Sequence, residues 1–249
     1  MRTSATGESA LLLLDVVQVL SKEQVDYAII GAMAASVYGV IRASRDADAL
    51  LSISVAALTG LERTFRAAGF HTELRRGDFD DPIGAVLTLQ DSFDNQVDLL
   101  VGIRGFDPEA FSRSIEVSLY GEPLKFVSLE DFIAMKLFAS DPQDIADAKS
   151  AIESALGPLD LDLVRKLASR YGADTVRTLE NLQGPRTALA RSRVSAPPPD
   201  TVGHPCLGRL SATEQQLKAR QRYRGIATSG CGHPPLARSC NRLPQSASV

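Results

Sequence analysis

The chain has 249 residues, 44% of them hydrophobic, and a formal net charge of −3 at pH 7. This length and apolar content suffice for a packed core, in one large domain or two small ones. No run approaches the roughly 20 apolar residues of a membrane-spanning helix, and Asp15 interrupts the run at 11–17, so we expect a cytoplasmic protein without a membrane partner.

The charge is divided unevenly along the chain. Residues 1–184 contain 17 Lys and Arg against 28 Asp and Glu, which gives −11, whereas residues 185–249 contain 10 against 2, which gives +8. The second segment also holds 8 of the 13 prolines and all three cysteines. Few aliphatic residues with a one-signed charge surplus cannot offset the entropy of ordering, so 185–249 is predicted to be a disordered basic tail.

Hydrophobic periodicity predicts alternating helices and strands in the acidic segment. In chain order these are a helix at 8–24, a strand at 26–30, a helix at 32–39, a strand at 46–53, a helix at 54–69, strands at 72–74, 85–89, 97–101 and 125–127, and helices at 128–139, 142–156, 160–171 and 173–182. Ser54 and Ser128 are expected as N-caps. The predicted fold class is α/β, with a mixed sheet core at 1–127 and a helical region at 128–184.

Two aspartates directly precede an apolar run in "DADALLSI" at 46–53. Residues i and i+2 of a strand face the same side, so Asp46 and Asp48 project together while Ala47 and Ala49 face the other way. Like charges repel and are costly to bury unless a cation compensates. Asp98 heads a second apolar strand, and if the two strands are neighbours, three carboxylates converge.

Converging carboxylates supply the hard oxygen ligands that Mg²⁺ prefers. Two ions about 4 Å apart would activate an attacking hydroxyl and hold a leaving pyrophosphate. Upstream, the turn at Gly31 leads into a helix N-terminus whose N–H groups suit triphosphate oxygens, and Arg42 and Arg45 can neutralise phosphate charge. Together these features predict a metal-dependent site for a triphosphate.

A known family shares this arrangement of residues. The string Gly31-Ala32 with Ala34 and Ala35, then Gly39, Arg42, Ser44, Asp46 and Asp48, resembles the hG[GS]…R-x-[ST]-x-D-x-D signature of the polymerase-β-type nucleotidyltransferase superfamily. Within it, the chain resembles the small bacterial branch around the AbiEii-like toxins and the minimal nucleotidyltransferases. Downstream, "VSLEDFIAMKLFASDPQDIADAKSAI" is similar to that branch's Ser-Leu-Glu-Asp start, mid-helix Lys and following Q-D-x-x-D. The resemblance covers about residues 25–156.

The resemblance implies an enzyme with two Mg²⁺ ions that transfers a nucleoside monophosphate from a nucleoside triphosphate to an acceptor hydroxyl and releases pyrophosphate. It implies Asp46 and Asp48 as metal ligands, and Asp98 as the third carboxylate, which binds metal and deprotonates or orients the acceptor. The nucleotide-binding residues that it implies are Gly31, Ala32, Arg42, Ser44 and Lys136. The implied acceptors are tRNA, a protein or a small molecule. The resemblance also implies a possible toxin–antitoxin partner protein.

Two alternatives stay open at this stage. Ala32 stands where the signature has Gly or Ser, so a hydroxyl contact is missing and the chain could be a catalytically weak nucleotide-binding regulator or antitoxin-like partner protein. A metal-dependent glycosyltransferase also uses Asp-x-Asp to bind a metal diphosphate, although it does not require the turn at Gly31.

Several residues near the motifs have ordinary readings as well. Asp91 and Asp94 are alternatives to Asp98 as the third carboxylate. Asp144 and Asp147, at i and i+3, could orient Lys136, but we favour a solvated acidic face for this pair. With only His71 before the tail, a multi-histidine metal site is excluded for residues 1–184. The cysteines and histidines of the tail match no common zinc module.

Overall fold

The computed structural model describes residues 1–40, 44–155 and 157–183. Two sequence predictions, the nucleotide-binding role of Arg42 and the disordered tail at 185–249, therefore lie outside the described residues. Within them, no helix has both the length and the apolar character needed to cross a membrane.

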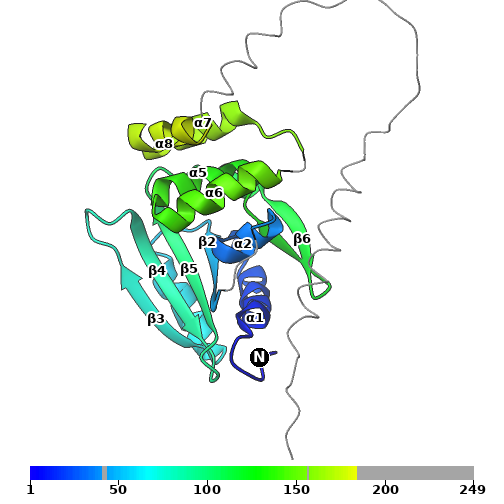
Figure 1. Cartoon of the computed structure of the whole chain (residues 1–249). Helices are drawn as coiled ribbons and strands as arrows, with labels where there is room; N and C mark the ends of the chain where they lie inside the picture. The colour runs from blue at the N-terminus through cyan, green and yellow to red at the C-terminus, as the bar shows by residue number, and fades with distance from the viewer. Residues whose placement is uncertain (41–43, 156, 184–249) are drawn as a thin grey trace, which may run out of the picture.

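Seven strands of the described chain form one mixed sheet, in the order β3-β4-β5-β2-β1-β7-β6 (Figure 1). Their bounds are β1 Tyr27–Ile30, β2 Asp46–Leu51, β3 His71–Arg76, β4 Ile83–Gln90, β5 Gln96–Ile103, β6 Ile115–Leu119 and β7 Glu122–Phe126. At the centre, β2 runs parallel to β5 and antiparallel to β1, and β1 runs parallel to β7. The outer pairs β3–β4, β4–β5 and β6–β7 are antiparallel. The predicted α/β class with a mixed sheet is confirmed.

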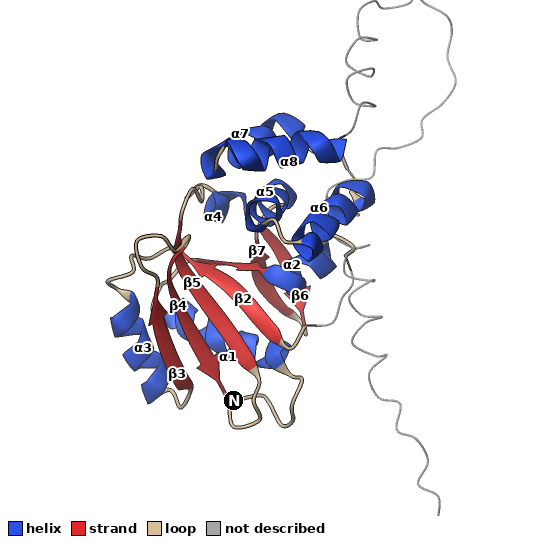
Figure 2. Ribbon diagram, turned by 60° about the vertical axis from the view of Figure 1, so that its left-hand side comes forward, coloured by secondary structure: helices blue, strands red, loops and turns tan. Residues whose placement is uncertain are grey.

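Helices flank this sheet and follow it along the chain. They are α1 Ser9–Lys22, α2 Gly31–Val37, α3 Leu58–Ala67, α4 Ala110–Arg113, α5 Leu129–Ala139, α6 Pro142–Ser154, α7 Leu161–Tyr171 and α8 Ala173–Gln183. In Figure 2, α1 and α3 lie behind the sheet, and α5 to α8 gather at one end of it.

The sheet face toward α1 and α3 belongs to the hydrophobic core. Helix α1 contacts β2 and β5, and α3 contacts β3 and β4. The residues of β2 and β5 on this face include Ala47, Ala49, Val97 and Leu99, each at most 1% exposed. Because side chains alternate along a strand, Asp46, Asp48 and Asp98 must point to the opposite face.

Several local features differ from the sequence predictions, among them the short helix α4, which was not predicted. Helix α3 begins at Leu58 because residues 55–57 form a turn, in which the N–H of Ala57 donates to the carbonyl of Ser54 (3.0 Å). Strand β6 was not predicted, since it is a short strand at the sheet edge in which only Val117 and Leu119 are buried. Gly31, whose φ of +64° is left-handed, is also the first residue of α2, so the predicted turn and the start of the helix coincide.

A partly buried charge network connects the helical region to the sheet region. Ser128 caps α5 as predicted, since its hydroxyl oxygen accepts the N–H of Asp131 (3.1 Å). The guanidinium of Arg113 donates twice to Asp131 (2.9 and 2.7 Å) and once to Asp107 (3.0 Å). The hydrogen bonds with Asp131 are the main cause of a raised pKa at Arg113.

Candidate active site

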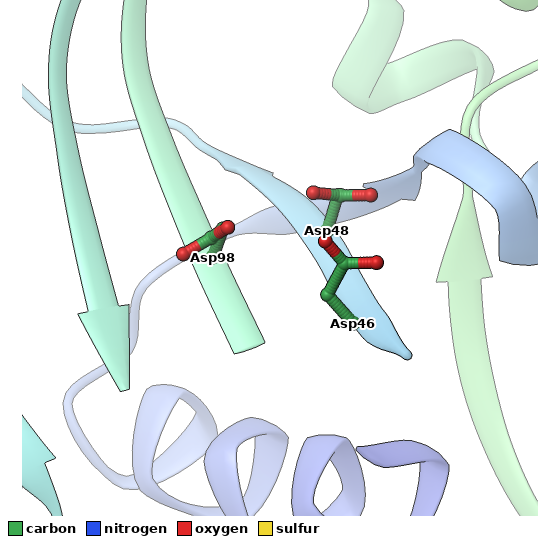
Figure 3. A group of neighbouring side chains, drawn as sticks. All are labelled: Asp46, Asp48 and Asp98. Atoms are coloured by element: carbon green, nitrogen blue, oxygen red, sulfur yellow. The ribbon is translucent and has the colours of Figure 1, made fainter. Parts of the chain in front are cut away.

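The strand register brings the three aspartates together. Asp48 lies opposite Asp98 where β2 and β5 run in parallel, and Asp46 lies opposite Gln96. Each aspartate offers a carboxylate oxygen, and these oxygens all lie within 4.8 Å of one another (Figure 3). All three residues are partly buried. The condition set by the sequence, that the two strands be neighbours, is therefore met.

Gly31 packs directly against one of these carboxylates. Its neighbour Ile30 pairs with Asp48 across β1 and β2. A Cβ at position 31 would lie 2.0 Å from Oδ2 and 2.9 Å from Cγ of Asp48, and Gly31 has a φ of +64°. Both the left-handed backbone and the close approach require glycine here.

The neighbouring residues of the motif make different contacts. The hydroxyl of Ser44, which is exposed, donates to Oδ1 of Asp46. Ser44 therefore orients a carboxylate of the trio directly. Ala32 is 4% exposed, so its methyl group packs in the interior.

Asp98 is held by two donors that the sequence analysis did not identify. The hydroxyl of Thr88 donates to Oδ1 (2.7 Å), and the side-chain amide of Gln96 donates to Oδ2 (2.9 Å). The amide of Gln90 in turn donates to the side-chain oxygen of Gln96 (3.0 Å). A signal for these residues was present, because Thr88 and Gln90, like Gln96 and Asp98, are polar at i and i+2 in apolar strands.

The alternative carboxylates lie in the loop between β4 and β5. Asp91, 4% exposed, accepts the N–H groups of Phe93 (2.8 Å) and Asn95 (3.0 Å) and the side-chain amide of Asn95 (2.8 Å). Burial opposes ionisation of Asp91, but these hydrogen bonds outweigh it and lower its pKa. Asp94 is exposed with a φ of +61°. Asp91 thus closes the loop, while Asp98 joins the other two aspartates.

Lys136 lies in a buried ion cluster on α5 and α6. Its Nζ is 2.6 Å from Oδ1 of Asp144 and 3.0 Å from Oδ2 of Asp147. Asp147 is fully buried and also accepts the side-chain amide of Gln143 (2.8 Å). The expectation of a solvated acidic face for Asp144 and Asp147 is therefore wrong, because α6 packs this face against α5. The nucleotide-binding role of Lys136 stays a prediction.

The aspartate trio has the donor set for a hard divalent cation. Two oxygens on opposite sides of one Mg²⁺ lie about 4.2 Å apart, close to the spread of this trio. Without a cation, two unit charges at 4.8 Å repel by about 1 to 3 kcal/mol for effective dielectric constants between water and a protein surface. A bound cation would remove this repulsion, so the three aspartates suit a bound Mg²⁺ ion.

The solved structures that are similar to this chain share little of its sequence. No model of a known protein family matches this sequence, and no curated protein matches it. Among solved structures, the antibiotic-resistance factor ANT(2'')-Ia is similar at 15% identity (TM-score 0.46, 73% of this chain and 95% of that chain).

Two further structures are similar at the same level. One is a nucleotidyltransferase-like protein from Paracoccidioides brasiliensis, at 18% identity (TM-score 0.45, 76% of this chain and 94% of that chain). The other is the lincosamide antibiotic adenylyltransferase LnuA, at 16% identity (TM-score 0.40, 61% of this chain and 100% of that chain). No identity among the three exceeds 18% and no TM-score exceeds 0.46.

Proposed function

We propose that the chain is a Mg²⁺-dependent nucleotidyltransferase of the polymerase-β type, which transfers a nucleoside monophosphate from a nucleoside triphosphate to an acceptor hydroxyl. The observation that carries this proposal is the convergence of Asp46, Asp48 and Asp98 within 4.8 Å, from two adjacent strands. It is supported by Gly31, whose missing side chain leaves room for Asp48.

Each carboxylate has a proposed role. Asp46 and Asp48 hold the metal, two ions in the full complex. Asp98 shares in metal binding and orients the acceptor hydroxyl or takes its proton. When bound, the ions supply charge neutralisation at the phosphates and activation of the attacking hydroxyl.

The proposed reaction is an in-line displacement at the α-phosphorus. The acceptor oxygen forms a bond to this phosphorus, the bond from the phosphorus to the bridging oxygen of the β-phosphate breaks, and pyrophosphate leaves. The proton of the acceptor hydroxyl passes to Asp98 or to water held beside it. Because such a reaction needs little covalent chemistry from the protein, positioning of carboxylates is the main task of this site.

Further residues belong to the proposal through the sequence resemblance. The backbone at Gly31 and Ala32 would contact the triphosphate, with Arg42, Ser44 and Lys136 as the remaining nucleotide-binding residues. The acceptor is tRNA, a protein or a small molecule, and membership of the AbiEii-like branch would make the chain one half of a toxin–antitoxin pair.

The test is transfer of label from α-labelled ATP, CTP, GTP and UTP, with Mg²⁺, into the RNA, protein and small-molecule fractions of a cell extract. The double variant Asp46→Ala/Asp48→Ala removes two carboxylates of the trio. The matched control Glu73→Ala/Asp80→Ala removes two exposed carboxylates outside it.

Label that enters one fraction with the wild type and the matched control, but not with Asp46→Ala/Asp48→Ala, supports the proposal and identifies the acceptor class. Equal labelling by all three proteins refutes the assigned site. Mg²⁺-dependent nucleotide binding without label in any fraction favours the regulator hypothesis instead.

A further inference from the structure

Both carboxylate oxygens of Asp98 accept a hydrogen bond from a neighbouring side chain. Thr88 donates to Oδ1 across the β4–β5 pairing, where it lies directly opposite Asp98. Gln96 donates to Oδ2 from the same face of β5, two residues earlier. These two donors fix the plane of the carboxylate, since each oxygen has its own partner.

A third residue determines which end of the Gln96 side chain faces Asp98. An amide side chain can present its oxygen or its NH₂ group after a half turn. Gln90, directly opposite Gln96 in the register, donates to the oxygen of Gln96. The NH₂ group of Gln96 is thereby directed to Asp98, where the oxygen would meet the carboxylate unfavourably.

We propose that Thr88, Gln96 and Gln90 are positioning residues, which hold the Asp98 carboxylate toward Asp46 and Asp48 for metal and acceptor. An ionised carboxylate has about four lone-pair sites, so two donors leave about two for a metal ion and an acceptor hydroxyl. This inference rests on the proposed function, because the orientation matters only if the trio binds a metal.

The polar character of these positions is not explained by packing alone. Val86 occupies the same face of β4, two residues before Thr88, and is partly exposed, whereas Thr88 is 6% exposed. An apolar residue would therefore suit the more buried position at least as well as it suits position 86. The hydrogen bond that the Thr88 hydroxyl donates to Asp98 explains the polar residue at position 88.

The test compares Thr88→Val, which removes the donor, with Thr88→Ser, which keeps it. Gln96→Met and Gln90→Met supply independent variants if Thr88→Val folds poorly. Mn²⁺ affinity is measured by electron paramagnetic resonance of the free ion, and kcat and KM for the triphosphate are measured in the transfer assay. Urea unfolding confirms that each compared variant is folded.

Loss of a residue that orients a metal ligand typically reduces metal affinity or activity by about 10- to 100-fold. We expect this loss in Mn²⁺ affinity and in kcat for Thr88→Val and Gln96→Met, a smaller loss for Gln90→Met, and wild-type behaviour for Thr88→Ser. KM for the triphosphate should change by less than about threefold, since none of the three residues is assigned to the nucleotide.

Two failures are distinguishable. If wild-type protein binds Mn²⁺ and Thr88→Val and Gln96→Met bind it equally well, the positioning role is refuted while the proposed function stands. If Asp46→Ala/Asp48→Ala binds Mn²⁺ as well as the wild type, the metal site itself is refuted and the proposed function fails with it. A Thr88→Ser variant as impaired as Thr88→Val would also overturn the assignment, because the donor would not be the cause.

Discussion

Replacement of Gly31 by alanine tests the closest contact in the site. The new Cβ would lie 2.0 Å from Oδ2 of Asp48, 2.9 Å from its Cγ and 3.2 Å from its Cβ. Separations below 3.0 Å force movement, and the atom that can move is the end of the Asp48 side chain. We therefore expect Gly31→Ala to rotate the carboxylate of Asp48 away from Asp46 and Asp98.

The cost of this substitution has two parts. Alanine at a φ of +64° costs about 1 to 2 kcal/mol, because Cβ crowds the following carbonyl in the left-handed region. Turning the Asp48 side chain away from its rotamer costs a further ~0.5 to 1.5 kcal/mol. Gly31→Ala should therefore lower the free energy of unfolding by about 1.5 to 3.5 kcal/mol.

Gly69 provides a matched control. It has a φ of +91°, and a Cβ there would meet no atom within 4 Å. Gly69→Ala should pay the backbone cost alone, about 1 to 2 kcal/mol, with the site intact. The two variants then separate the strain of the backbone from the displacement of Asp48.

The assay combines urea unfolding with Mn²⁺ binding. We expect the affinity for Mn²⁺ to fall by at least about tenfold in Gly31→Ala and to remain at the wild-type value in Gly69→Ala. If Gly31→Ala keeps wild-type Mn²⁺ affinity, Asp48 does not need its observed position, and the steric argument is wrong. If Gly69→Ala loses affinity to the same extent, the loss comes from general destabilisation and not from the contact.

Three further predictions concern charge. Asp46→Asn should raise the free energy of unfolding of the metal-free protein by about 1 kcal/mol, because it removes like-charge repulsion. The same substitution should abolish the rise of Tm that Mg²⁺ causes in the wild type. A rise of Tm that persists in Asp46→Asn would contradict the role of Asp46 as a metal ligand. Lys136→Met leaves the buried carboxylate of Asp147 and the partly buried carboxylate of Asp144 without their cation, and it should cost about 3 to 5 kcal/mol in urea unfolding. Lys149→Met, at an exposed ion pair on α6, should change the free energy of unfolding by less than about 0.5 kcal/mol. Equal effects of the two substitutions would contradict a structural role for the Lys136 cluster. Burial opposes ionisation of Asp107, but the hydrogen bond and charge of Arg113 outweigh burial and lower the pKa of Asp107 below 3.8. The ionised Asp107 therefore contributes stability above pH 3.8, and this contribution is lost as the pH falls through the folded-state pKa. Asp107→Asn should therefore be less stable than the wild type at pH 7, and the difference should narrow below pH 3.8 in thermal unfolding; a constant difference would contradict the linkage.

Local sequence patterns were sufficient for most elements and for the aspartate motif. Alternation placed Asp46 and Asp48 on one face and Ala47 on the other, because the side-chain period of a strand is fixed by backbone geometry. Ser128 was identified as an N-cap because a side-chain oxygen there satisfies a free N–H of the first turn. Both depend on residues close together in the chain.

The same patterns failed where packing of one helix against another decided the outcome. Asp144 and Asp147 read as a solvated face, since an isolated helix offers no sign of what covers it. Packing of α6 against α5 buries Asp147 completely and pairs it with Lys136. A buried charge is stable only with a partner, and the partner comes from another helix.

The sequence by itself determined which residue types are present, the side of each strand that they face and, through the resemblance, the chemistry to expect. Only the tertiary structure decided that β2 lies beside β5 with Asp48 opposite Asp98, that Thr88 and Gln96 hold Asp98, and that Gly31 touches Asp48. The physical reason is that strand pairing and close packing depend on the complementarity of whole faces brought together in the folded chain. A local pattern repeats every two or four residues and does not identify the strand or helix against which it will pack.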